Sequence, residues 1–173
     1  MPARPVKHHN LTMLGLTAAL LVLVADQASK WWILEVLQLE RLRQVVLLPV
    51  LNLTMVWNHG VTFGLLTGFG EWGPLILAAV ALAVVMALMV WLHRAETRMV
   101  AIAIGAIAGG AVGNVIDRVR FGAVVDFLHV HIDTRWGDFS WYVFNVADAA
   151  IVCGVATLVI DSLCWPKTEA KRR

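Results

Sequence analysis

Four long apolar stretches dominate this sequence, and each has the length of a helix that crosses a bilayer. They cover residues of about 11–34, 74–92, 99–116 and 143–165. The second stretch contains no charged residue and, as a helix, extends roughly 28 Å, enough to span the hydrocarbon core. Hydrophobic residues form 60% of the chain and charged residues 15%, whereas soluble domains have roughly 45–50% and 25%. The sequence therefore predicts an all-α membrane fold, a bundle of four transmembrane helices that forms a single domain over residues 1–173.

Positively charged residues predict how this bundle is oriented. Lys and Arg are concentrated in the N-terminal tail, in the 93–98 turn and in the C-terminal tail, and they are sparser in the two longer loops. Because cytoplasmic segments are enriched in Lys and Arg, both termini are expected in the cytoplasm. The loops at about 35–73 and 117–142 are then expected on the outer, periplasmic side. The first apolar stretch follows Arg4 and Lys7 as a secretory signal would, but it continues through Trp31 and Trp32, so we interpret it as a retained span.

The outer loops show their own periodicity. Apolar residues at helical spacing over 33–43 predict a short helix that lies in the membrane interface. Apolar and polar residues alternate from Leu51 to Asn58, and Ala123 to Ile132 is a second β-like run, so a small sheet is expected beside the outer leaflet. In the third span, glycine recurs every four residues, which allows a neighbouring helix to approach closely. These glycines are Gly105, Gly109 and Gly113.

Polar side chains occur where hydrocarbon is expected. A charged side chain at the bilayer centre costs roughly 2.5–3.5 kcal/mol on insertion scales, so such residues usually face a bundle interior and have a function. In this chain they gather toward the outer side, which predicts a functional site there. The residues are Asp26, Asn114, Asp117, Asp126, Asn145 and Asp148.

Two of these carboxylates fit acid–base chemistry. Asp126 lies among apolar residues, which should raise its pKa by desolvation. Asn145 and Asp148 are three residues apart and share a helix face, which also fits a helix cap formed by Asn145 with Asp148 in the first turn. Two carboxylates in a partly dry site share one proton, so one can activate water while the other binds a peptide carbonyl. The residues leave open which aspartate holds the proton.

The remaining polar residues have structural interpretations beside the functional one. Asp26 and Lys30 are four apart on the first helix, and they fit either an ion pair that reaches toward the interface or a pair that positions a substrate or a loop. Asp117 and Arg118 follow Asn114 at the expected end of the third span, where a polar network would satisfy backbone groups of the loop.

Other classes of site have weaker support. His129, His131 and Asp133 could point the same way on a strand, but a third firm ligand is not obvious, and we predict no metal site. No basic stripe or nucleic-acid motif accompanies the net charge of +2. Cys153 and Cys164 are too far apart on one helix to form a disulfide.

Five motifs occur in a recognisable order along the chain. They are 26–30 (Asp-Gln-Ala-Ser-Lys), 58–64 (Asn-His-Gly-Val-Thr-Phe-Gly), 109–118 (Gly-Gly-Ala-Val-Gly-Asn-Val-Ile-Asp-Arg), 122–127 (Gly-Ala-Val-Val-Asp-Phe) and 144–148 (Phe-Asn-Val-Ala-Asp). With these motifs the chain resembles bacterial lipoprotein signal peptidase, the type II signal peptidase, over essentially its whole length.

The resemblance implies an aspartic endopeptidase of the bacterial inner membrane. Such enzymes cut prolipoproteins on the amino side of a cysteine that carries diacylglycerol, and they need no cofactor. The catalytic pair carries over to Asp126 and Asp148. It also implies inhibition by globomycin-type peptides, contact with membrane lipid and a monomeric state. Positions that shape or support the site in this family carry over to Asp26, Lys30, Asn58, Gly60, Asn114, Asp117, Arg118 and Asn145.

Residues 61–64 (Val-Thr-Phe-Gly) depart from the Ala-Ala-Phe-Ser that many family members carry, which bears on loop contacts rather than on the reaction. Two other functions stay open from the residues themselves. Intramembrane Asp, Asn and Lys also line ion pathways, so a small transporter or proton-conducting module is one alternative. A non-catalytic assembly partner built on the glycine-rich third span is the other.

Overall fold

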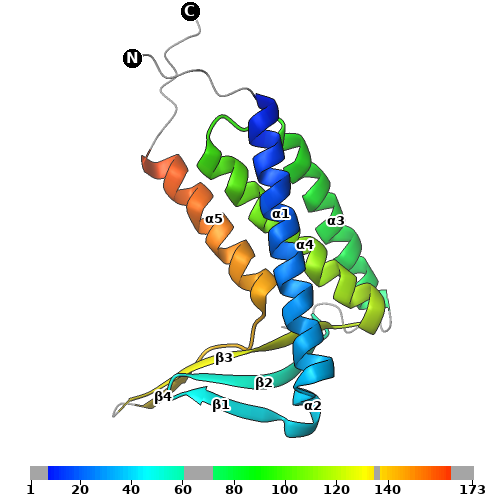
Figure 1. Cartoon of the computed structure of the whole chain (residues 1–173), viewed down its shortest axis with the longest axis vertical. Helices are drawn as coiled ribbons and strands as arrows, with labels where there is room; N and C mark the ends of the chain where they lie inside the picture. The colour runs from blue at the N-terminus through cyan, green and yellow to red at the C-terminus, as the bar shows by residue number, and fades with distance from the viewer. Residues whose placement is uncertain (1–7, 61–71, 135–136, 165–173) are drawn as a thin grey trace, which may run out of the picture.

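The computed structural model describes residues 8–60, 72–134 and 137–164. Four long helices lie side by side, and an antiparallel sheet lies across one end of them (Figure 1). The helices are α1 (His8–Trp31), α3 (Gly73–Leu92), α4 (Arg98–Phe121) and α5 (Val146–Cys164). All four are long and apolar enough to cross a membrane. The four predicted spans are therefore confirmed as helices.

Helix α4 is the centre of the bundle. In its most apolar window 61% of the residues are buried, against 17% or less in the other three helices. Gly105 and Gly109 lie directly against the backbone of α1 at Gly15 and Ala19, where any added Cβ would overlap a carbonyl oxygen. This confirms that the predicted glycine repeat lets a neighbouring helix approach closely.

The segment predicted as one interfacial helix, 33–43, is divided. A π-helical turn, η1 (Trp32–Val36), continues α1, and only a single turn, α2 (Leu39–Leu42), follows it. Gln38 and Arg43, on either side of α2, have positive φ angles of 51° and 62°, which stop a right-handed helix. The apolar spacing identified helical residues, but it did not reveal these two breaks.

Helix α4 is longer than predicted. It runs to Phe121 and ends at Gly122, whose φ of 70° forms a left-handed C-cap. Asp117 and Arg118 therefore lie inside the last turns of the helix, and the expectation that they follow its end was wrong. The fourth span begins later than predicted, at Val146, because Phe144 still pairs with Leu128 in a β-bridge.

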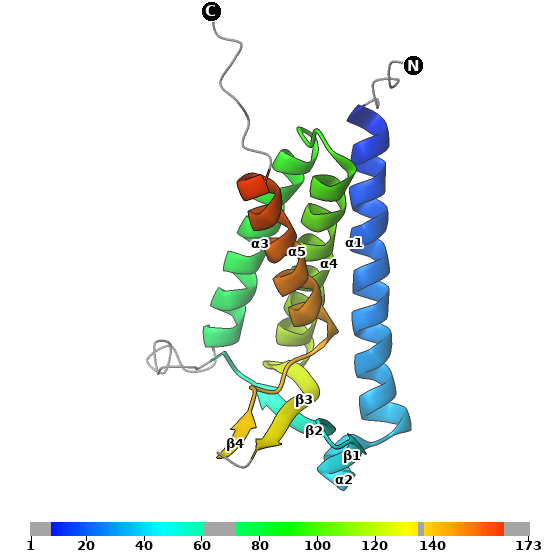
Figure 2. The same cartoon turned by 90° about the vertical axis from the view of Figure 1, so that its left-hand side faces the viewer.

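The sheet has the strand order β1-β2-β3-β4, and each neighbouring pair is antiparallel. Its strands are β1 (Gln44–Leu48), β2 (Leu51–Asn58), β3 (Val124–Thr134) and β4 (Gly137–Ser140). The sequence predicted β2 and β3, but not the two edge strands. Figure 2 shows the sheet beneath the helix ends, with β3 and β4 below α5.

Pairing between β2 and β3 positions the polar end of the bundle. In their register Val56 faces Asp126 and Asn58 faces Val124. An apolar cluster that includes Ile33, Leu39 and Phe127 fixes the sheet against η1 and α2. The start of β3 is thereby held directly beside the ends of α4 and α5.

Candidate active site

The N-terminus of α5 is closed by a reciprocal cap. Asn145 Oδ1 accepts a hydrogen bond from the Asp148 amide at 2.9 Å, and Asp148 Oδ2 accepts one from the Asn145 amide at 3.2 Å. Each side chain thus satisfies a backbone N–H that the first helical turn leaves unpaired. The predicted cap is confirmed, and it fixes the Asp148 carboxylate at the positive end of the helix dipole.

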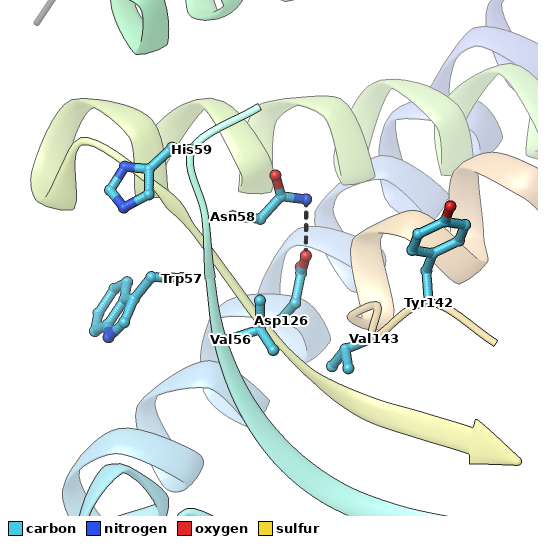
Figure 3. A pocket seen from close by; sticks show the side chains of 7 residues that line it. All are labelled: Val56, Trp57, Asn58, His59, Asp126, Tyr142 and Val143. Atoms are coloured by element: carbon cyan, nitrogen blue, oxygen red, sulfur yellow. Dashed lines mark hydrogen bonds between the residues drawn. The ribbon is translucent and has the colours of Figure 1, made fainter. Parts of the chain in front are cut away.

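The same asparagine reaches the strand. Asn145 Nδ2 donates to Asp126 Oδ1 at 2.7 Å. Asn58 Nδ2 donates to Asp126 Oδ2 at 2.9 Å (Figure 3). Asn58 is itself held, because its Oδ1 accepts a bond from the Gly60 amide at 2.9 Å. Both oxygens of Asp126 therefore accept bonds from neutral amides, and within the described part of the chain no cation bonds to them directly.

The carboxylate of Asp148 likewise accepts hydrogen bonds from neutral N–H donors. Its Oδ1 accepts a bond from Asn114 Nδ2 at 2.8 Å, while Oδ2 is used in the cap. Asp126 is buried and Asp148 is half-buried. Because Asn145 bonds to both aspartates, the structure brings together two carboxylates that are far apart in sequence and lie on different elements.

A second group of charges lies deeper in the bundle. Lys30 Nζ contacts Asp26 Oδ2 at 2.8 Å, Asp117 Oδ2 at 2.7 Å and Asn114 Oδ1 at 3.0 Å. Lys30 is 3% exposed, Asp117 1% and Asp26 0%. The prediction of an Asp26–Lys30 pair is confirmed, but the interpretation that it reaches toward the interface was wrong. Gln27 Nε2 donates to both carboxylates, at 3.2 Å and 3.0 Å.

This buried charge cluster also holds the backbone that carries the two aspartates. Asp26 Oδ1 accepts the amide of Ala147 at 3.0 Å, one residue before Asp148. Asp117 Oδ2 accepts the amide of Val125 at 3.1 Å, one residue before Asp126. The cluster therefore fixes the relative position of β3 and α5, and Asn114, which bonds to both Lys30 and Asp148, connects it to the Asp126–Asp148 pair.

Arg118 is half-buried near this junction. Its Nη1 donates to the Asn114 carbonyl at 3.4 Å, and its Nε has no hydrogen-bond partner among the described residues. The charges of Asp148 and Asp126 act on its guanidinium, although in the described part of the chain it forms no hydrogen bond to either carboxylate. The structure thus places Arg118 beside the pair while leaving part of its donor capacity unused.

A pocket of about 650 Å³ opens onto Asp126 (Figure 3). His59 and Tyr142 line it, although sequence reasoning assigned neither to the site. His59 Nδ1 donates to the Gly122 carbonyl at 3.2 Å, which ties the end of β2 to the start of β3. The position of His59 inside the Asn58–Gly60 motif was the available signal. The lining residues are Val56, Trp57, Asn58, His59, Asp126, Tyr142 and Val143.

Burial dominates the electrostatics of Asp126. Desolvation raises the pKa of its carboxyl from 3.8 to about 6. The bonds from Asn58 and Asn145 and the charge of Lys30 oppose this rise, while the charge of Asp148 adds to it. The pKa shift has the direction expected from the apolar sequence around Asp126.

The two histidines on β3 lie close to each other and to β4. The rings of His129 and His131 lie 5.6 Å apart, and His129 Nε2 is 2.6 Å from Ser140 Oγ. Among the described residues, no group of three or more His, Cys, Asp or Glu side chains could hold a metal ion. The side chain of Asp133 and residues 61–64, which depart from the family pattern, lie outside the described part.

Known proteins of similar sequence identify the family of this chain. Residues 18–164 match the family model of signal peptidase (SPase) II. The chain is 50% identical to the lipoprotein signal peptidase of Methylorubrum extorquens (strain PA1), covering 86% of this chain and 85% of that protein. It is 47% identical to the one from Beijerinckia indica subsp. indica, covering 87% of both chains.

Structural comparison identifies solved proteins with a similar fold. A solved bacterial membrane enzyme superposes with a TM-score of 0.73 at 26% identity, covering 92% of this chain and 94% of that one. A second bacterial membrane enzyme structure gives a TM-score of 0.72, also at 26% identity, covering 89% and 94%. The chain therefore belongs to the signal peptidase II family, the lipoprotein signal peptidases, and is a bacterial membrane peptidase that removes signal peptides from prolipoproteins.

Proposed function

We propose that Asp126 and Asp148 form the catalytic pair with which this peptidase cuts diacylglyceryl-modified prolipoproteins. The cut falls on the amino side of the lipidated cysteine, and the site lies on the periplasmic side of the inner membrane. The observation that carries this proposal is Asn145, whose side chain bonds to Asp126 while its backbone amide bonds to Asp148. Two carboxylates held by amides, beside a pocket and without a bonded cation, are suited to share one proton.

The two environments favour different roles for the two aspartates. Asp148 lies in the first turn of α5, where the helix dipole and two N–H donors favour negative charge. Asp126 lies on a strand, is 1% exposed and has a pKa raised chiefly by desolvation. We therefore assign the shared proton to Asp126 and the role of base to Asp148. A substrate that covers the pocket removes further water and strengthens this assignment.

The reaction then follows in two stages. Asp148 removes a proton from water as its oxygen attacks the scissile carbonyl carbon, and Asp126 gives its proton to the carbonyl oxygen. The resulting tetrahedral diol collapses as the C–N bond breaks. Asp148 gives its proton to the departing amine of the cysteine, and Asp126 takes the proton back from the diol hydroxyl. Both carboxyl groups end in their starting states.

The supporting residues act by holding this geometry. Asn58, with Gly60 behind it, orients Asp126, and Asn114 orients Asp148. The Asp26–Lys30–Asp117 cluster fixes the two backbones. The guanidinium of Arg118 adds positive charge near both aspartates. The same pocket would admit a globomycin-type peptide, and a monomer contains every residue of the proposed site.

The experiment that tests this function is cleavage of a diacylglyceryl-modified prolipoprotein by the purified protein in detergent. Asp126→Asn and Asp148→Asn are compared with wild type and with Asp161→Asn, a half-buried acid on α5 outside the site. We expect each site variant to stay folded and to cut roughly 10²–10⁴-fold more slowly than wild type, the usual contribution of general acid–base catalysis. Asp161→Asn should cut normally. Site variants that still cut at the wild-type rate would exclude the catalytic pair.

A further inference from the structure

A second pocket, of about 550 Å³, lies along the same sheet. Val130 and Ile132 of β3 line it together with Phe139 of β4 and the following Trp141. Tyr142 lines both this pocket and the one that contains Asp126. The two pockets therefore adjoin each other at Tyr142. Strand β3, which lines the second pocket, extends beyond the helix ends (Figure 1).

The apolar β3 side chains of the second pocket lie on the face of the sheet that carries Asp126, while the paired residues His131 and Ser140 of the other face complete its lining. Side chains alternate along a strand, so Asp126, Val130 and Ile132 point to one face. Phe139 is the register partner of Ile132, and directly paired residues of neighbouring strands share a face. A continuous surface thus runs from the carboxylate of Asp126 to the apolar side chains at the far end of β3.

This face is turned toward the helix bundle. Asp126 bonds to Asn145, which is the N-cap of α5, so the face that carries Asp126 looks toward the membrane-spanning helices. Figure 2 shows the β3–β4 end lying beneath them.

The second pocket, which we call the groove, is lined by large apolar side chains that are exposed. Ile132 is 52% exposed, Phe139 66%, Trp141 70% and Tyr142 81%. Large contiguous apolar surface of this kind marks a binding site. From Asp126 to Ile132 the strand extends roughly 20 Å at about 3.3 Å per residue, which is comparable with an extended long-chain fatty acid.

We propose that this groove binds an acyl chain of the diacylglyceryl group on the substrate cysteine. The inference rests on the proposed function, in which that cysteine follows the scissile bond at Asp126. The lipid then leaves the catalytic pocket past Tyr142 and lies along Val130, Ile132 and Phe139. Continuity with the catalytic pocket favours the substrate's own chain over a lipid of the surrounding bilayer.

The test compares two peptide substrates, one with a dioctanoyl and one with a dipalmitoyl glyceryl group on the cysteine, in mixed micelles of constant composition. Phe139→Ser and the milder Ile132→Ala are compared with wild type and with Val46→Ser, which alters an exposed apolar residue on β1. For the dipalmitoyl substrate we expect kcat/KM to fall roughly tenfold in the groove variants, as when about two methylene groups lose their apolar cover. The dioctanoyl substrate and the Val46→Ser variant should change less than about twofold on the same scale.

Three results would contradict the inference. If the groove variants lower cleavage of both substrates equally, the groove acts on the bilayer or on the fold. If neither substrate is affected while the variants are folded, the acyl chain lies elsewhere. If wild type cuts neither substrate, the proposed function itself fails, and the inference fails with it. A diazirine at the end of the long chain adds a direct readout, because it should label the 130–142 segment and not β1.

Discussion

Four buried or half-buried aspartates gather at one end of this protein, and they have two contrasting environments. Asp26 and Asp117 share the ammonium group of Lys30 and are almost fully buried. Asp126 and Asp148 are bonded only by amides, and Asp126 opens to a pocket. Residues from three or more segments of the chain form the surroundings of each pair.

The contrast shows how a membrane protein separates support from chemistry. The ammonium group of Lys30 bonds to Asp26 and Asp117, and their carboxylates also accept the backbone amides of Ala147 and Val125. Neutral amides orient the Asp126–Asp148 pair without fixing its charge, so a proton can move there during a reaction. Three variants should break or sharpen this division.

The largest effect on folding is expected from Lys30→Met. Removing the ammonium leaves two buried carboxylates without a counter-charge, which should lower the free energy of unfolding by about 3–5 kcal/mol. Thermal unfolding in detergent measures the loss. Arg120→Met on the exposed end of α4 is the matched control and should change stability by less than about 0.5 kcal/mol. An unchanged melting temperature in Lys30→Met would show that the cluster is not a support.

The pH dependence of stability should identify Asp126 as the titrating acid. Its pKa is about 6 in the fold and 3.8 without the fold's influence, so between these values the unfolded chain loses this proton before the native chain. Stability should therefore fall as pH rises from about 4 to 6, by about 1.4 kcal/mol per pH unit, and stay lowered above pH 6.

Asp126→Asn should remove this part of the pH dependence and be more stable than wild type above pH 6. Melting curves from pH 4 to pH 8 provide the measurement. Asp148→Asn should keep a weaker pH dependence, because the charge of Asp148 raises the pKa of Asp126. Identical slopes in wild type and Asp126→Asn would mean that another group titrates.

The smallest effect on folding, yet a clear one on activity, is expected from Asn145→Ser. Serine keeps an oxygen for the helix cap but lacks the amide that donates to Asp126 and Asn114. Stability should fall by about 1 kcal/mol, whereas kcat should fall roughly tenfold to a hundredfold because the two carboxylates lose alignment. Stability in detergent and single-turnover cleavage separate the two. If activity falls only as much as stability, the bridge has no catalytic part.

Several features could be predicted from the sequence because they depend on local patterns. Long, mainly apolar runs determine the four spans, and the three-residue spacing of Asn145 and Asp148 determines the helix cap. The four-residue spacing of Asp26 and Lys30 determines their ion pair, and the apolar neighbours of Asp126 predict the direction of its pKa shift. Each of these relations joins residues that are close along the chain.

Tertiary structure alone determined the rest, because its partners are distant in sequence. Pairing of β2 with β3 brings Asn58 to Asp126, and packing of α1 on α4 turns the Asp26–Lys30 pair into a three-residue cluster with Asp117. The positive φ angles that divide the predicted outer helix occur at Gln38 and Arg43, residue types that do not favour this region, so residue preference did not predict them. The sequence did not predict the edge strands. Strand β4, for example, has only 4 residues, too few for an alternating apolar–polar pattern to be recognised. A site built from contacts across the chain becomes visible only when folding has placed its members side by side.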